Sequence, residues 1–159
     1  MKDIQIKINI KLIEERELSD VEKDLIEKAK QATFRSYAPY SNFFVGASLM
    51  LESGKTLTGS NQENCAYPSG LCAERTTMFY ANSRFPDQKI VSLAIAARDT
   101  SGEFTKMPIS PCGACRQVFI EVYHRQNAPF KILLYGTEGT YVIDSPLDLM
   151  PISFDSSYL

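Results

Sequence analysis

Two short apolar runs constrain the fold of this chain most strongly. Residues Ile90 to Ala97 and Lys131 to Tyr135 are almost continuously apolar, which is typical of strands that other elements cover on both faces. Each run follows a segment with helical character, Cys72 to Asn82 and Cys112 to Gln126. This order predicts an α/β fold in three layers (α/β/α), in which helices pack on both faces of a mixed sheet.

Other parts of the chain add elements to that core. A helix is expected to start at Ser19 or Asp20, either of which can cap it, and to run to about Tyr37, since Pro39 disfavours its continuation. A hairpin is predicted from Phe44 to Leu51 and Lys55 to Thr58. Near the end of the chain, a strand is predicted at Tyr141 to Ile143 and a short helix at Pro146 to Met150.

The N-terminal residues have a different pattern. Between positions 4 and 12, Ile4, Ile6, Ile8, Ile10 and Leu12 alternate with polar residues. Period-two alternation is typical of a half-buried strand. We therefore expect an extra N-terminal strand that serves packing or assembly.

Length and charge narrow the class of protein. A chain of 159 residues with 44% hydrophobic residues is expected to form a single domain, 1–159, with one core. The net charge of −2 disfavours nucleic acid as the main partner. No apolar stretch approaches the roughly 20 residues of a membrane span, and charges interrupt the N-terminus. The chain is expected to be cytoplasmic, with no membrane partner.

Three of the four cysteines form a pattern that suits a metal. Cys72 stands alone, and Cys112 and Cys115 follow about 40 residues later, with one predicted strand between. A zinc ion held by three protein ligands keeps a fourth position open for water, whereas a structural site normally closes it with a fourth ligand. Both segments are expected to begin helices, so that the two N-termini point at one ion. The spacing therefore favours a catalytic zinc centre.

Two charged residues flank the first cysteine. Zinc with three thiolates carries a net charge of −1, which the positive ends of two helix dipoles and a guanidinium would offset. Arg75 and Arg116 each follow a cysteine motif, and we expect Arg75 to be the nearer partner of the thiolates. Glu74 is expected to move protons for a metal-activated water. This order of residues matches the all-cysteine form of the zinc nucleobase deaminase signature.

Four motifs in order make the chain similar to a known family. They are YSNFFVGA from Tyr40, NQEN from Asn61, CAERT from Cys72 and SPCGACRQ from Ser110. With them the chain resembles the small, three-cysteine cytidine deaminases over roughly residues 18–154. The resemblance implies hydrolytic deamination of cytidine or deoxycytidine to the uracil nucleoside and ammonia, in pyrimidine salvage.

The resemblance also implies a role for each matched residue. It makes Cys72, Cys112 and Cys115 the zinc ligands, Glu74 the proton shuttle and Arg75 the partner of a thiolate. Asn61 and Glu63 match residues that hold the ribose hydroxyls, and Phe43 matches an aromatic residue of the pyrimidine pocket. Phe154 matches a residue that reaches the active site of a neighbouring subunit in a homotetramer. Zinc is the only cofactor implied.

Two positions depart from the family pattern, and two others are assigned no role. Phe44 stands where the family often has Pro, which changes local packing, and Cys65 stands where Ala is common. We interpret Cys65 as a free cysteine that serves as a small buried hydrophobic residue. His124 lies about three turns into its predicted helix and is too far from the N-terminus to reach the metal.

Three other functions remain open from the residues alone. A deaminase of another aminopyrimidine nucleoside, such as an antibiotic of the blasticidin type, uses the same chemistry, although Asn61 and Glu63 favour a ribose. A non-catalytic, zinc-stabilised interaction module would explain the three cysteines but would give Glu74 no role. An enzyme that edits nucleic acid is least favoured, because of the net charge of −2.

Overall fold

The computed structural model describes residues 1–159, and a six-stranded mixed sheet forms its centre. The strand order is β1-β6-β5-β4-β2-β3. β4 and β5 are parallel, and every other neighbouring pair is antiparallel. The strands are β1 (Lys11–Ile13), β2 (Phe44–Leu51), β3 (Thr56–Ser60), β4 (Ile90–Arg98), β5 (Lys131–Gly136) and β6 (Gly139–Ile143).

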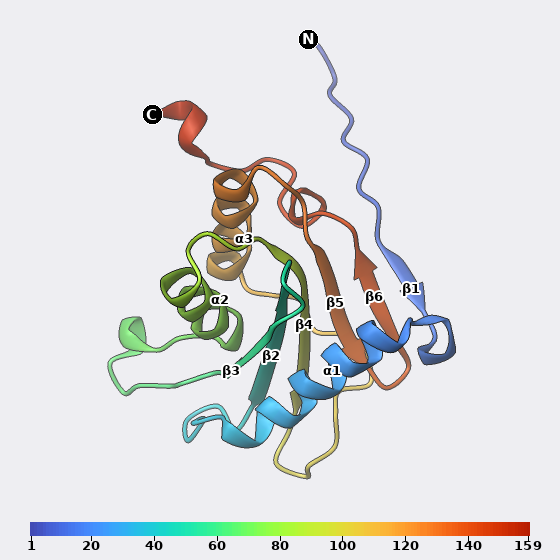
Figure 1. Ribbon diagram of the computed structural model, residues 1–159, viewed down its shortest axis with the longest axis vertical. Helices are drawn as coiled ribbons and strands as arrows, with labels where there is room; N and C mark the ends of the chain where they lie inside the picture. The colour runs from blue at the N-terminus through green and yellow to red at the C-terminus, as the bar shows by residue number, and fades with distance from the viewer.

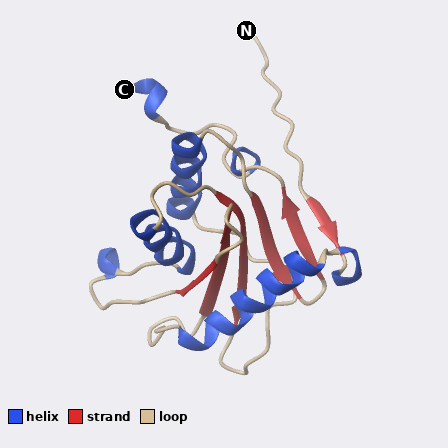
Figure 2. Ribbon diagram, in the orientation of Figure 1, coloured by secondary structure: helices blue, strands red, loops and turns tan.

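Three helices cover the two faces of this sheet (Figure 1; Figure 2). The helices are α1 (Asp20–Ala32), α2 (Ala73–Arg84) and α3 (Gly113–Gln126). α1 packs Leu25, Ile26 and Ala29 on one face of the sheet. α2 and α3 share the opposite face, where Met78 and Phe119 belong to the larger apolar core. The predicted three-layer arrangement is confirmed.

A close approach fixes α1 against the centre of the sheet. A side chain at Gly46 in β2 would place its Cβ 2.1 Å from the carbonyl oxygen of Ala29 and 2.6 Å from the backbone nitrogen of Thr33. Only glycine permits this contact. The 3-10 turn at Thr33–Arg35 then ends the helical segment, a little before the predicted limit at Tyr37.

The prediction of a strand over residues 4–12 is wrong for most of its length. Only Lys11–Ile13 form a strand, which pairs with β6. Because β6 ends at Ile143, it offers no further backbone partner along residues 4–10. This segment leaves the body of the molecule as an extended chain (Figure 1). Alternation predicted the local conformation but could not supply a partner.

The other predicted elements are present, with small changes at their ends. The late helix is reduced to a 3-10 turn at Pro146–Asp148. No helix combines the length with the apolar character that crossing a bilayer requires.

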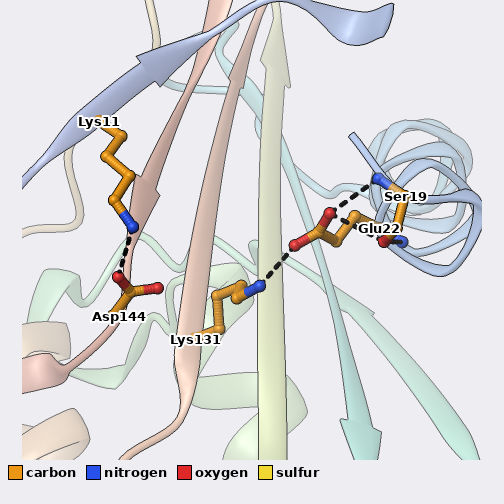
Figure 3. A network of polar contacts seen from close by, with 5 residues as sticks. All are labelled: Lys11, Ser19, Glu22, Lys131 and Asp144. Carbon is orange, nitrogen blue, oxygen red and sulfur yellow. Dashed lines mark hydrogen bonds and ion pairs between the residues drawn. The ribbon is translucent and has the colours of Figure 1, made fainter. Parts of the chain in front are cut away.

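Ion pairs tie the start of α1 to the sheet (Figure 3). Ser19 and Glu22 form a capping box: the backbone N–H of Ser19 donates to Glu22 Oε2 at 2.9 Å, and the Glu22 N–H donates to Ser19 Oγ at 3.3 Å. The second Glu22 oxygen accepts from Lys131 Nζ of β5 at 2.7 Å. Beside them, Lys11 of β1 pairs with Asp144 at 2.9 Å.

We predict that Glu22→Gln lowers the free energy of unfolding by about 0.5–1 kcal/mol at neutral pH. Glutamine preserves the capping box but removes the charge that faces Lys131. Burial by itself raises the pKa of Glu22, but hydrogen bonds from Lys131 and Ser19 outweigh burial and lower the pKa below 4.5. The contribution is therefore fully present above pH 4.5 and is lost as the pH falls through the folded-state pKa.

Urea unfolding at several pH values measures this difference. The control is Glu121→Gln on α3, where the side chain is exposed and makes no ion pair; it should leave the urea midpoint unchanged. An effect of Glu22→Gln that persists undiminished at low pH would contradict the role of the charge.

Candidate active site

The sheet topology places the N-termini of α2 and α3 at one edge. α2 leads through residues 85–89 into β4, and α3 leads through residues 127–130 into β5. α2 lies against β2 and β3, and it shares with α3 the face of the sheet opposite α1 (Figure 1). Because β4 and β5 are parallel neighbours, the two helices run in the same direction, and both begin near the carboxyl ends of these strands. In open α/β sheets this edge is where ligands bind.

Three cysteine sulfurs meet at these helix starts. Cys72 and Cys112 are the N-cap residues of α2 and α3, as the sequence predicted, and Cys115 is buried in the first turn of α3. Cys72 Sγ lies 3.8 Å from Cys112 Sγ, which lies 3.5 Å from Cys115 Sγ. All three sulfurs lie within 4.8 Å of one another.

These separations fit a zinc ion. A Zn–S bond of about 2.3 Å in tetrahedral geometry places two sulfurs about 3.8 Å apart. They are also too long for a disulfide, whose sulfurs lie about 2.05 Å apart. The donor set is soft and has three members, which suits zinc with one further position.

Arg75 is the guanidinium nearest to the sulfurs. Its Nη2 donates to Cys72 Sγ at 3.7 Å, whereas Arg116 turns away and donates to the carbonyl oxygens of Pro111 and Leu149. Hydrogen bonds from Cys115, and then from Arg75 and Cys112, lower the pKa of Cys72 to about 5 against the opposing effect of burial. The same contact with Cys72 raises the pKa of its neighbour Cys115.

Glu74 lies buried between these groups and the core. It is 4% exposed, and its Oε2 has no hydrogen-bond partner. Burial raises the pKa of Glu74 to about 7. A buried carboxyl oxygen without a partner is costly in a protein interior. It is also the arrangement of a group that exchanges protons with a bound ligand.

A cavity of about 460 Å³ opens beside the sulfurs. Cys72 and Arg75 form its metal-facing wall, and the loop that follows β3 supplies Asn61 and Glu63. Its size is in the range of small-molecule sites. The remaining lining residues are Tyr40, Ser41, Gln62, Asn64, Tyr67, Gly70 and Leu71.

The loop before β2 holds the Glu63 carboxylate in place. The backbone N–H groups of Tyr40 and Ser41 donate to Glu63 Oε2 at 2.9 and 3.3 Å. The Ser41 hydroxyl donates to Oε1 and accepts from the N–H of Phe43 at 3.1 Å. The bond from the Ser41 hydroxyl and the backbone bonds lower the pKa of Glu63. Glu63 is thus a fixed carboxylate on the cavity wall.

Asn61 binds the start of β2. Its Oδ1 accepts from the N–H of Val45 and its Nδ2 donates to the carbonyl oxygen of Phe43, both at 2.9 Å. An amide can donate twice and accept twice, so each end keeps one free position toward the cavity.

Of the predicted site residues, Cys72, Arg75, Asn61 and Glu63 line this cavity, whereas Glu74, Cys112 and Cys115 do not. Within a single chain the two predicted aromatic residues do not line it either. Phe43 is half-buried, and its backbone, rather than its ring, contacts Asn61. Phe154 is 59% exposed and stacks on Tyr158 with ring centroids 5.7 Å apart. Gln117 of α3 donates to the Phe154 carbonyl oxygen at 2.8 Å, so the tail runs along α3 and away from its own cavity.

The positions assigned no function lie apart from the sulfur cluster. The prediction that Cys65 is buried is wrong, because its side chain is exposed beside Asn64 in the loop after β3. His124 Nε2 lies 3.4 Å from Asp155 Oδ2 of the tail. Phe44 begins β2, where the Arg98 guanidinium lies 4.5 Å from the centre of its ring.

Sequence reasoning missed several residues that line the cavity. Ser41 belongs to the YSNFFVGA motif and lies two positions before Phe43. This closeness to a predicted site residue could have marked Ser41 as part of the cavity wall. Tyr67 and Leu71 lie in the segment between two motifs, where no spacing marked them. Only the fold of that segment over the cavity identifies them.

Comparisons with known proteins agree with this geometry. Residues 19–128 match the family described as the cytidine and deoxycytidylate deaminase zinc-binding region. The chain is 38% identical over 130 residues to a cytidine deaminase of Halalkalibacterium halodurans, covering 82% of this chain and 91% of that protein. It is 41% identical over 140 residues to a cytidine deaminase of Sporosarcina psychrophila, covering 88% of this chain and 95% of that protein.

A solved structure shares the fold as well. The crystal structure of cytidine deaminase from Burkholderia pseudomallei has a TM-score of 0.71 and 39% sequence identity, and the similarity covers 83% of this chain and 98% of that one. The sequence match includes both cysteine motifs, and the sulfurs they supply fit one zinc ion. The chain therefore belongs to the zinc-binding cytidine and deoxycytidylate deaminase family.

Proposed function

We propose that this protein deaminates cytidine or deoxycytidine hydrolytically, giving the uracil nucleoside and ammonia, and that it serves pyrimidine salvage. The observation that carries the proposal is the buried Glu74 carboxyl, with one oxygen unpartnered beside three sulfurs that fit zinc. The names of the relatives from Halalkalibacterium halodurans and Sporosarcina psychrophila support the same reaction.

Cys72, Cys112 and Cys115 would hold the zinc ion, and Arg75 would bind the Cys72 thiolate. When bound, zinc supplies a Lewis acid that lowers the pKa of the attacking water. The helix dipoles of α2 and α3 and the Arg75 guanidinium offset the negative charge of three thiolates. Arg75 is thus a positioning residue, because it acts through a ligand and not on the substrate.

Glu74 carries the proton transfers of the reaction. Its carboxylate accepts a proton from water that attacks the ring carbon bearing the amino group, and delivers a proton to the adjacent ring nitrogen. The hydroxyl on the tetrahedral carbon then becomes the carbonyl, and Glu74 passes the proton of that hydroxyl to the amino group, which leaves as ammonia. A pKa of about 7 lets Glu74 both accept and donate near neutral pH.

The charges of the cavity favour a nucleoside over a nucleotide. Glu63 and Arg75 are the charged side chains on its wall, and Arg75 is committed to the Cys72 sulfur. A phosphate would meet the fixed Glu63 carboxylate without a free cation to bind it. Ribose hydroxyls, in contrast, can donate to Glu63 and bond to the free positions of Asn61.

A homotetramer with active sites at the subunit interfaces completes the proposal. Phe154 is exposed and lies outside its own cavity, and Cys112 is exposed in the single chain. In a tetramer Phe154 would close a neighbour's site, and Phe43 would line the pyrimidine pocket. Thiol ligands require a compartment that keeps cysteines reduced, which supports a cytoplasmic location.

Turnover by the zinc-loaded protein tests this function directly. Ultraviolet absorbance should fall as cytidine or deoxycytidine is converted, and chromatography should identify the uracil nucleoside. Blasticidin-type nucleosides and deoxycytidylate should react more slowly. Zinc-replete protein that converts neither nucleoside would overturn the proposal in favour of a non-catalytic zinc module.

We predict that the protein binds about one zinc ion per chain and that Cys115→Ser greatly weakens this binding. Loss of a ligand should cost more than the roughly 10- to 100-fold that loss of an outer-shell partner costs. The control is Cys65→Ser, an exposed cysteine outside the cluster. Metal analysis after gel filtration and competition with a chelator measure both variants, and equal zinc loss from the two would contradict the ligand assignment.

We predict that Glu74→Gln lowers kcat by at least about 10²- to 10⁴-fold, the range for a general acid–base group, while zinc stays bound. The amide keeps the shape of the side chain but cannot shuttle protons. Glu121→Gln on α3 should leave kcat unchanged. Zinc content and kcat are measured on the same samples, and turnover that survives Glu74→Gln would assign the proton transfers elsewhere.

We predict that Ser41→Ala raises the KM for cytidine about 10-fold, because a hydrogen bond to a charged group is worth about 1.5–3 kcal/mol. The kcat should change little, since Ser41 acts through Glu63 and not at the reacting carbon. With 2′,3′-dideoxycytidine, which has no ribose hydroxyls, the same substitution should have almost no effect. Ser41→Thr, which retains a hydroxyl, should restore the KM. Equal losses on both substrates would indicate a purely structural role.

A further inference from the structure

The extended N-terminal segment carries a row of exposed apolar side chains. Ile4, Ile6, Ile8 and Ile10 are 42–81% exposed, and Leu12 of β1 is 55% exposed. Alternation places all five on one face of an extended chain. Single exposed apolar residues are ordinary, but five in one row form a surface that favours a partner.

The backbone of this segment also has no strand beside it. The pairing of β1 with β6 begins at Lys11. Before Lys11, the Asn9 N–H donates to Asp148 Oδ1 at 3.1 Å. The sheet ends at β1, so the outer side of β1 and the segment before it offer one continuous open edge. Such an edge is a template for pairing with another chain.

The segment lies outside the part of the chain that defines the family. The family match begins at residue 19. The similarity to the Burkholderia pseudomallei structure covers 98% of that protein but only 83% of this chain. The apolar row is therefore not required by the zinc centre or its fold.

The sequence of the segment is complementary to itself in one antiparallel register. When Ile8 of one copy faces Ile8 of another, Ile4 faces Leu12 and Ile6 faces Ile10. All five apolar residues of each copy then face apolar residues. On the other face the partners are Gln5 with Lys11, Lys7 with Asn9 and Asp3 with Ile13. At the ends of the apolar row, Lys2 faces Glu14. No like charges stand opposite each other.

Neighbouring registers are less favourable. A shift that centres the pair on Lys7 places two lysines opposite each other, and a shift that centres it on Asn9 places Lys7 opposite Lys11. Like charges directly opposite are destabilising in a sheet. A shift that centres the pair on Ile6 leaves Leu12 without an apolar partner. A shift by one residue in either direction would place Ile6, Ile8 and Ile10 opposite polar residues.

We propose that residues 4–12 of two copies of this chain pair as antiparallel strands about a two-fold axis at Ile8. The contact is isologous, so each segment satisfies the other and the assembly closes at two strands. It joins the β1 edges of two sheets and removes both open edges. The bodies of the two copies lie at opposite ends of the paired segment, about 30 Å apart for nine residues at 3.3 Å each.

Disulfide formation at single positions tests the register. In zinc-loaded protein carrying Cys65→Ser, Ile8→Cys should form a covalent dimer under mild oxidation at least 10-fold faster than Ile6→Cys. Opposite residues have Cα atoms about 4.5–5.5 Å apart, within the range that a disulfide spans. The double variant Ile6→Cys with Ile10→Cys should restore rapid dimer formation, since these two positions face each other.

Hydrogen exchange tests the pairing without cysteines. The alternate amides of residues 4–10 that face the second strand should exchange at least 10-fold more slowly than those of an unpaired segment, and Ile8→Lys should abolish this protection. Val21→Lys, an exposed position on α1, is the matched control and should leave it intact. Fast exchange in the parent protein overturns the proposal, and so does slow exchange without crosslinking of Ile8→Cys, which would place the segment on another surface.

These results are separable from the proposed enzymatic function. The segment lies far along the chain from the cavity residues, and neither readout depends on turnover. Loss of crosslinking in an active enzyme would refute only the pairing of the segments. Crosslinking in a protein without deaminase activity would refute only the proposed reaction.

Discussion

The packing of α2 and α3 on one face of the sheet is the constraint on which the site depends. Met78 of α2 and Phe119 of α3 are fully buried in one apolar core with residues of β4 and β5. Because these strands are parallel, burial of the two helices brings Cys72 beside Cys112 and Cys115 with no covalent bond between the motifs. Hydrophobic burial, worth about 25 cal/mol per Å², thus supplies the free energy that holds three electron-rich sulfurs together. The cost of that crowding is reduced by the helix N-termini and by Arg75.

The predictable parts of the fold are those that local patterns specify. The starts of α2 and α3 followed from the cysteine motifs, and the limits of β4 and β5 from their apolar runs. Residues 4–10 show where local pattern fails, since alternation describes a strand but not whether a neighbour exists. The cluster of three cysteines was predictable because a zinc site uses few residue types at short spacing. The wall that Tyr67 and Leu71 form depends on a long irregular loop, whose path no periodicity encodes.

The two sides of the cavity are organised by different physical means. On the metal side, helix ends and buried sulfurs create a strong local field, and Glu74 remains unpartnered within it. On the opposite side, Glu63 is held by hydrogen bonds from the loop that contains Ser41. A fixed carboxylate loses little conformational freedom on binding a hydroxyl group. Folding therefore fixes the orientation of Glu63 before a ligand binds. Glu74, on the side of the sulfurs, keeps a carboxyl oxygen without a hydrogen-bond partner.

Both chain ends are exposed because the single core does not extend to them. A chain of 159 residues closes its core around the sheet and leaves Ile4 to Ile10 and Phe154 outside it. Both ends project from the same end of the molecule (Figure 1). Apolar side chains that a single copy cannot cover gain most from a second copy, because each contact is made twice about a symmetry axis. The proposed assemblies would therefore extend hydrophobic burial to the parts of the chain that the single core leaves in water.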